Sequence, residues 1–372
     1  NLSPSSNIDF DNPNLKQKLL RVGVDVEESR KTGGYYQVDS KVLEYYSKIP
    51  GIEIISLEEA IEEFGDLLEK YYWRAVPVDK DKYTAVAELY GKGGYVIIAK
   101  RGSKIPQPIS TCLLVYSNNV LQAPHNIVVV EDGAELHIVT GCTVMREVSA
   151  LHAGVSEFYV GKKAKLTFTM IHGWSMMQHV RPRTGVIVDE GGEFISHYIT
   201  MAPSRTLQTM PVVRLVGDDA KAHLSSVVVG GKNALLDVGG MVELWGAGTS
   251  GEIISRVLGK DRSINIARAR LEGVGEKTRG HIECMGLLLS GDAVIKTVPE
   301  LEARTSETSL THEASIGKIA EDEILYLVAR GFNRDEATSM IVRGFLNIRV
   351  EGLPRELQKA IEYTINLVSR GL

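Results

Sequence analysis

The spacing of hydrophobic positions changes twice along the chain, from helical to strand-like and back to helical. The first part of the chain has the helical spacing. One apolar stripe at helical spacing consists of Leu57, Ile61, Phe64, Leu68 and Tyr72. Ser56, with Glu59 three positions later, forms a capping-box pattern that predicts a helix from residue 57 to 72. One strand-like run, Tyr95 to Ala99, follows a Gly93-Gly94 turn. We therefore expect residues 1–105 to form a mostly helical N-terminal region.

The middle of the chain, residues 106–316, has no helical period. Short runs of Val, Ile, Leu, Phe and Thr are separated by Gly, Asp and Lys. This pattern predicts an all-β region with many strands.

A repeat runs through this middle region. Segments that begin with a small residue and continue as a strand start at Ala134, Ala164, Gly192, Ala220, Gly251, Gly280 and Thr308. Their second residues are polar and their third residues apolar, so the third position should face a core because strand side chains alternate. Stacked repeats of this kind favour a parallel β-helix. An ordinary β-sandwich remains the alternative.

The fifth position of each segment has the same parity as the core position. It reads Ile138, Phe168, Ser196, Leu224, Ser255, Cys284 and His312. Cys284 and His312 would then lie on successive turns, about 4.8 Å apart, with Glu313 pointing the other way. Thiolate, imidazole and carboxylate groups could together bind iron or sulfur. Alternatively, Cys284 is a small buried hydrophobic residue and His312 an ordinary histidine.

Helical signals return after residue 316. Glu321 to Arg330 predicts one helix that ends at Gly331. Asn333, with Glu336 three positions later, predicts the start of a second helix that runs to Val350, and Pro354 predicts the start of a last helix. We expect residues 317–372 to form a compact helical region.

Composition excludes several classes of protein. The 372 residues are 44% hydrophobic and 24% charged with a net charge of −5, which is typical of a globular protein and argues against a basic nucleic-acid binder. No apolar run approaches the roughly 20 residues of a membrane span, and residues 1–10 do not resemble a secretory signal. We therefore expect a cytoplasmic protein. Gly-rich phosphate loops and serine-hydrolase elbows are also missing from the sequence, so we expect no enzymatic activity of this chain itself.

The chain has three cysteines, Cys112, Cys142 and Cys284. An odd number argues against a disulfide framework and favours a reducing compartment. Three thiolates also cannot hold a four-thiolate iron–sulfur cluster within one chain.

Several motifs together resemble the SufB/SufD family. They are Thr140-Gly-Cys-Thr, Leu151-His-Ala-Gly-Val, Gly280-His-Ile-Glu-Cys-Met-Gly, Thr311-His-Glu-Ala-Ser-Ile-Gly-Lys and Ile341-Val-Arg-Gly-Phe-Leu. The resemblance covers about residues 85–350. It implies a scaffold for iron–sulfur cluster assembly, with a right-handed parallel β-helix core between helical terminal regions. It also implies a homodimer or a SufB–SufD heterodimer, and docking of the ATPase SufC.

The resemblance also implies roles for individual residues. Cys284 would build a nascent iron–sulfur cluster, with His312 and Glu313 as further ligands. Electrons could come from a reduced flavin, although the sequence has no flavin motif. The candidates for docking SufC in the C-terminal region are Glu321, Tyr326, Arg330, Phe332, Ile341 and Phe345.

Two departures from SufB leave alternatives open. The family's sulfur-accepting cysteine is replaced near Val213, and an N-terminal cysteine cluster is missing. The chain is therefore either a compact SufB-like scaffold or a SufD-like partner that docks SufC without carrying a cluster. A β-helical carbohydrate-active enzyme is less consistent with the outward column, which alternates Glu and Lys.

Overall fold

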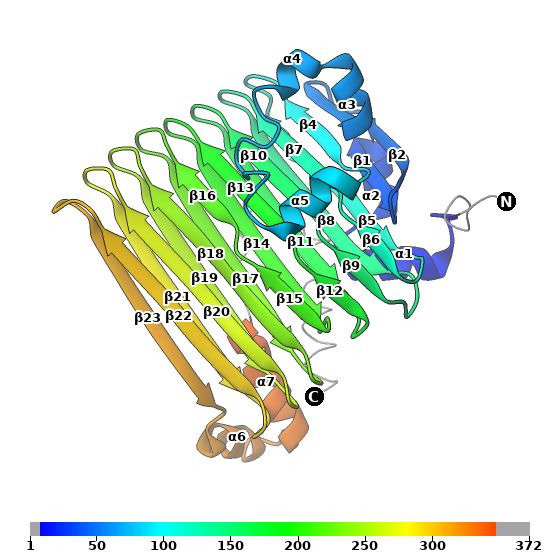
Figure 1. Cartoon of the computed structure of the whole chain (residues 1–372). Helices are drawn as coiled ribbons and strands as arrows, with labels where there is room; N and C mark the ends of the chain where they lie inside the picture. Colours follow the sequence, from blue (N-terminus) through cyan, green and yellow to red (C-terminus); the bar gives the residue numbers. More distant parts are fainter. Residues whose placement is uncertain (1–7, 347–372) are drawn as a thin grey trace.

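The computed structural model describes residues 8–346, most of which form a parallel β-solenoid of about eight turns (Figure 1). Each turn contributes to two long sheets that face each other across a common core. The mainly β fold with a parallel β-helix core, expected from the repeat, is confirmed. The helices belong to the segments before and after the regular turns, and some of them lie on the sides of the solenoid, where α5 (Lys82–Tyr90) packs near β10 (Val155–Val160) and α7 (Arg334–Leu346) packs against one of the two sheets.

Sheet A contains ten strands and is parallel except for its first pair, β1 and β2, which is antiparallel. Its strands, in spatial order, are β2 (Lys41–Ser47), β1 (Gly33–Val38), β5 (Ile109–Val115), β8 (Glu135–Val144), β11 (Lys165–Gly173), β14 (Glu193–Ala202), β17 (Lys221–Gly230), β19 (Ser250–Gly259), β21 (Arg279–Leu288) and β23 (Ser309–Lys318).

Sheet B changes character along the solenoid, because its early turns contain two short strands and its late turns one long strand. The first row is β3 (Ile52–Ser56), β4 (Tyr95–Ala99), β7 (His125–Val130), β10 (Val155–Val160), β13 (Arg183–Val188) and β16 (Val212–Leu215). The second row is β6 (Val120–Gln122), β9 (Ala150–His152), β12 (Gln178–Val180) and β15 (Thr206–Thr209). Both rows meet on β18 (Leu235–Leu244), which is followed by β20 (Ile264–Gly273) and β22 (Val294–Ala303).

The N-terminal region is less helical than the sequence suggested. It contains α1 (Pro13–Leu20), α2 (Val26–Thr32), α3 (Leu57–Glu63), α4 (Gly65–Leu68) and α5 (Lys82–Tyr90), but also strands β1 to β4, which begin both sheets. Ser56 caps α3 as expected, its hydroxyl accepting from the Glu59 amide at 3.2 Å. The single helix predicted over 57–72 is wrong, because Phe64 takes a non-helical conformation (φ −128°, ψ 36°) and the chain restarts at Gly65.

The predicted core positions line the space between the sheets. Leu136, Leu166, Phe194, Ile253 and Ile282 are all buried in one continuous apolar cluster. Each turn is stabilised by its neighbours because stacking buries this column of apolar side chains on successive strands.

The pairing register differs from the sequence alignment by two residues in the late turns. Lys221 of β17 pairs with Ser250 of β19, where the alignment expected Glu252. Arg279 of β21 pairs with Ser309 of β23, where the alignment expected His281 as the partner of Ser309. Between these two slips, Gly251 pairs with Gly280 as the alignment expected. A two-residue slip keeps every side chain on its face, because strands alternate with period two. It does change which side chains are neighbours.

The two ends of the solenoid differ in which elements lie over the terminal strands. At the N-terminal end, β2 and β3 pair antiparallel to the first parallel strands, and α1 and α2 lie beside them. At the other end, β22 and β23 are the last strands of the described chain, and their inward side chains lack a following turn. Ile316 and Leu301 are therefore 41% and 37% exposed.

Two described helices follow β23. They are α6 (Glu321–Val328) and α7 (Arg334–Leu346), and Val342 and Leu346 of α7 pack with Ile171, Ile199 and Val227 of sheet A. Gly331 has a positive φ of 99°, as a helix-ending glycine should. The capping box is confirmed, since the Asn333 and Glu336 amides each donate to the other's side chain at 2.9 Å. The end of the second predicted helix and the last predicted helix lie outside the described residues.

No helix in the described part of the chain is long and apolar enough to cross a membrane.

Candidate functional site

Cys284 lies on β21 with its side chain in the closed interior of the solenoid. It is fully buried in the main apolar cluster, and it lies opposite Ser255 on one side and Ala314 on the other. Burial is the main cause that raises the pKa of this thiol to about 11; nearby Arg256 lowers it and Glu283 raises it. In the single chain, Cys284 is therefore a protonated thiol at neutral pH and a poor nucleophile.

His312 lies on β23 and is exposed, because no further strand of residues 8–346 covers it. It pairs in register with Ile282, so the expected stacking of His312 on Cys284 is wrong. The two side chains share the inward face of sheet A but are offset by two residues along the strand. The reason is the register of the last turns, which the corner loops set.

Glu313 points to the outer face of sheet A, away from Cys284. It pairs with Glu283 of β21, whose carboxylate forms an ion pair with the Arg256 guanidinium of β19. Arg256 and Glu283 were not singled out from the sequence, although their outward parity next to Glu313 was a readable signal. Arg256 is well placed to offset the repulsion between the two neighbouring carboxylates.

The three predicted ligands therefore do not converge in one chain. Among residues 8–346, no group of three or more His, Cys, Asp or Glu side chains is arranged to hold a metal ion. Of the three predicted ligands, the two exposed on the last described strand are His312 on the inner face and Glu313 on the outer face.

The other two cysteines and Val213 are also buried, Cys142 and Val213 in the main core and Cys112 in a separate apolar cluster with α1 and α2. Cys112 and Cys142 are fully buried, and burial raises the pKa of both thiols. Val213 lies on β16 between Val186 and Val242 in the core. A valine at this place cannot accept sulfur.

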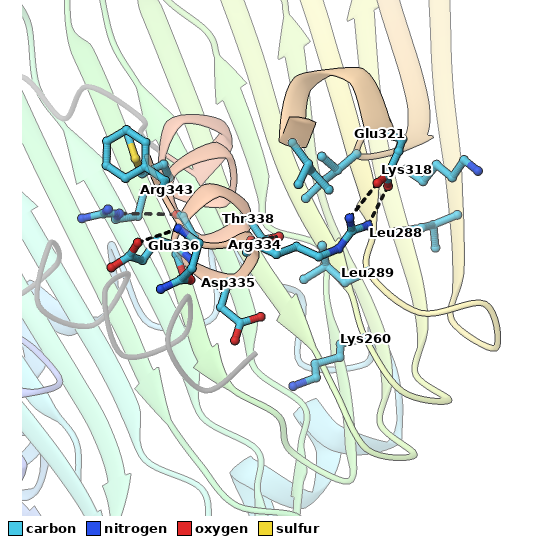
Figure 2. A pocket seen from close by; sticks show the side chains of 16 residues that line it. Lys260, Leu288, Leu289, Lys318, Glu321, Arg334, Asp335, Glu336, Thr338 and Arg343 are labelled. Carbon is cyan, nitrogen blue, oxygen red and sulfur yellow. Dashed lines mark hydrogen bonds and ion pairs between the residues drawn. The ribbon is translucent and has the colours of Figure 1, made fainter. Parts of the chain in front are cut away.

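A groove of about 790 Å³ lies between the C-terminal helices and the ends of three strands of sheet A (Figure 2). Leu288, Leu289 and Lys318 line its sheet side, and Phe332, Met340 and Arg343 line its helix side. The Arg334 guanidinium spans part of the groove and binds the Glu321 carboxylate of α6 through two contacts of 2.6 Å. This pair links α6 to the first turn of α7.

The predicted docking residues divide into two sets. Tyr326 is 57% exposed, and the Arg330 guanidinium lies over its ring at 4.4 Å; Phe332 is also exposed and lines the groove. Ile341 and Phe345 are half-buried, and Phe345 packs against the apolar cluster under α7. The sequence did not single out Leu325 and Val328, which extend the exposed apolar surface of α6.

The fold places the protein in a structural class: a parallel β-solenoid with one capped end, one open end and a helical unit attached to its last described strand. The family model for the SufBD core domain of SUF-system iron–sulfur cluster assembly matches residues 113–345. The chain belongs to this SufBD family.

Relatives from several organisms support the assignment. An iron–sulfur cluster assembly SufBD family protein of Archaeoglobus fulgidus is 43% identical over 358 residues, 96% of each chain. One of Methanothermobacter thermautotrophicus is 42% identical over 363 residues, 96% of this chain and 88% of the relative. One of Staphylococcus aureus is 29% identical over 353 residues, 92% of this chain and 75% of the relative.

Proposed function

We propose that the chain is a scaffold subunit of iron–sulfur cluster assembly that joins a second SufBD-type chain through its open solenoid end. The observation that carries this proposal is that no further turn of the described chain covers the last strands. Ile316 and Leu301 continue the buried columns of the preceding turns and yet are about 40% exposed. The outer edges of β22 and β23, which pair with no other strand within residues 8–346, border the same surface, and such edges readily pair with another chain.

A second chain at this end would also complete a ligand set. One chain presents His312 and Glu313 there, and a partner of the same family would add its own side chains across the interface. Two chains together could supply the ligands of a cluster, although a single chain has too few thiolates to hold one. The cluster is cargo that such a site holds and releases.

Cys284 joins this site only if the last turn opens. Its thiol lies one strand below His312 and is sealed in the core, so β23 would have to move away to expose it. Only two residues, Ile319 and Ala320, separate β23 from α6. A partner that pulls on α6 would therefore act directly on the strand that covers Cys284.

We propose the ATPase SufC as that partner, docked on α6 and the rim of the groove in Figure 2. Leu325, Tyr326 and Val328 form an exposed apolar patch on α6, and large apolar side chains at a surface commonly mark a protein interface. This chain contributes no ATPase activity in the proposal.

The alternative is a SufD-like partner that docks SufC and carries no cluster. The buried, protonated Cys284 and the separation of the three ligands favour it for the isolated chain. Both versions use the same open end and the same docking helices. They differ only in whether the chain supplies ligands.

Anaerobic reconstitution with Fe²⁺ and sulfide, in the presence of SufC and a second SufBD chain, separates the two. If the chain supplies ligands, His312→Ala should remove cluster absorbance, and Cys284→Ala should do so when the last turn opens. His281→Ala, on the outer face of the neighbouring strand, is the matched control. Unchanged absorbance in both variants would leave the SufD-like role.

Sedimentation velocity tests the open end itself. Ile316→Lys should shift the complex toward single chains, because it places a charge on the proposed apolar interface. Leu89→Lys on α5, where the side chain is 71% exposed, should not. If Ile316→Lys leaves the assembly intact, the open end is not the interface.

A further inference from the structure

Few apolar contacts attach β23 to the rest of sheet A. Residues 311–318 of this strand are all exposed. On its inward face, Ala314 lies opposite Cys284, and Ile316 lies opposite Gly286, which has no side chain to contact it. Apolar burial therefore contributes little to the attachment of this strand.

Ion pairs attach β22, the last described strand of sheet B, to its neighbour β20. Arg270 of β20 lies 2.8 Å from Glu302 and 3.6 Å from Glu300, both on β22. Arg304, directly after β22, lies 2.5 Å from Glu272 of β20, whose side chain is only 9% exposed. A network of charges that is partly shielded from water contributes more than isolated surface pairs. The outer face of sheet B therefore holds its last strand in place.

The outer face between β21 and β23 has the opposite character. Glu283 and Glu313 pair in register, with backbones about 4.8 Å apart, and like charges at directly opposite strand positions are destabilising. Arg256 forms an ion pair with Glu283, but no side chain within residues 8–346 forms one with Glu313. His281 and Thr311 make a side-chain hydrogen bond of 2.8 Å across the same two strands. The carboxylate pair weakens the attachment of the strand that covers Cys284.

The chain is anchored on both sides of β23. Before the strand, Thr308 Oγ1 lies 2.9 Å from Thr278 Oγ1 and 3.1 Å from Thr305 Oγ1, and Thr278 is fully buried. After it, Val342 and Leu346 of α7 are fully buried against sheet A. Movement of β23 between these two anchors does not require the rest of the solenoid to unfold.

We infer that β23 is a strap that separates from β21 while β22 stays in place, and that repulsion between Glu283 and Glu313 favours this opening. The inference rests on the proposed function, because it states how Cys284, which Ala314 of the strap covers, becomes accessible. The hinges are the contacts of Thr308 and the two residues between β23 and α6. A positive charge brought against Glu313 by a partner chain removes the repulsion and closes the strap.

Hydrogen–deuterium exchange of the full chain, followed by mass spectrometry, tests the strap without SufC or a second SufBD chain. The protein concentration is one at which sedimentation velocity shows single chains. Backbone amides that β23 donates to β21 should exchange roughly fivefold faster, relative to their unprotected rates, than those that β22 donates to β20. Glu313→Gln should slow the exchange of β23 about twofold, and Glu313→Lys, which is attracted to Glu283, about fivefold.

Glu302→Gln is the matched control, because it removes a carboxylate from the ion pairs of β22. It should speed the exchange of β22 and leave that of β23 unchanged. Iodoacetamide labelling of Cys284 gives a second readout. It should slow in Glu313→Lys by the same factor as the exchange of β23, because opening of the strap exposes the thiol.

Equal exchange of β22 and β23, or unchanged exchange of β23 in Glu313→Lys, would overturn the strap. So would exchange that changes equally in all strands, since the motion would then be global unfolding, which urea denaturation of the same variants measures. None of these outcomes alters the reconstitution or the sedimentation experiment, so failure of the strap is distinguishable from failure of the proposed function.

Discussion

Cys284 and His312 lie on adjacent strands of sheet A but two residues out of register. His312 faces Ile282, and Cys284 faces Ala314. Both side chains belong to the inward face, yet one is sealed in the core and the other is exposed at the end of the solenoid. Chemistry that needs both groups therefore requires movement of the last turn or a second chain.

Cys284 should react slowly in the folded single chain. Its pKa of about 11, against an ordinary value of 9.0, reduces the thiolate fraction at pH 8 roughly a hundredfold, and burial adds a steric barrier. Iodoacetamide labelling followed by mass spectrometry should show little modification until urea unfolds the protein. If SufC and ATP open the last turn, labelling of Cys284 should accelerate while that of Cys112 does not. Equal labelling in folded and unfolded protein would contradict the buried placement.

Glu157 fastens the segment around residues 73–76 to sheet B. Its fully buried carboxylate accepts from the backbone N–H groups of Trp73, Ala75 and Val76 at 2.6, 2.6 and 3.0 Å, and lies 2.8 Å from His125 Nε2. Glu157→Gln places an NH₂ group against these donors and should cost about 3 kcal/mol of unfolding free energy. Urea denaturation measures this.

Glu135→Gln is the matched control for that experiment. Glu135 forms an exposed ion pair with Lys104 at 2.8 Å, and such pairs contribute about 0–1 kcal/mol. A Glu157→Gln variant as stable as Glu135→Gln would mean that the segment is held by its apolar contacts alone.

Gly217 lies at a corner where two turns of the solenoid touch. A Cβ atom there would come within 1.9 Å of the Glu190 backbone nitrogen, so the corner must shift to accept alanine. Gly217→Ala should lower the unfolding free energy by about 1–3 kcal/mol, the usual cost of overpacking. Gly291→Ala, where a Cβ would meet nothing within 4 Å, should change it little. Thermal unfolding of the two variants gives the comparison.

His152 should make the protein less stable in mild acid. Burial lowers its pKa from 6.5 to about 4, so the unfolded chain binds its proton at a higher pH than the folded chain does. Between pH 6.5 and 4 the unfolded state holds more protons, and stability falls as the pH falls through this window. The contribution is fully present above pH 6.5 and declines by about 1.4 kcal/mol per pH unit below it.

The slope of unfolding free energy against pH tests whether His152 is the titrating group. His152→Gln should flatten the dependence of unfolding free energy on pH by about one proton between pH 4 and 6.5, even if it lowers stability at pH 7. Urea denaturation at several pH values measures both. An unchanged slope would mean that His152 binds its proton equally in both states.

In the middle region, the sequence determined the strands and the faces of their side chains. Alternating apolar residues gave the strands of the middle region, the inward column from Leu136 to Ile282 and the solenoid, because burial of one face of a strand leaves a period-two pattern. Local capping patterns gave the starts of α3 and α7, since Ser56 and Asn333 act through atoms within three residues.

Only the tertiary structure decided which side chains are neighbours. A slip of two residues preserves every inward and outward position, so the alternating pattern cannot distinguish Cys284 beside His312 from Cys284 beside Ala314. Corner turns and whole-strand pairing set that register. The same register places Glu313 beside Glu283, which lies 30 positions earlier in the chain, whereas the sequence alignment would place it beside Met285.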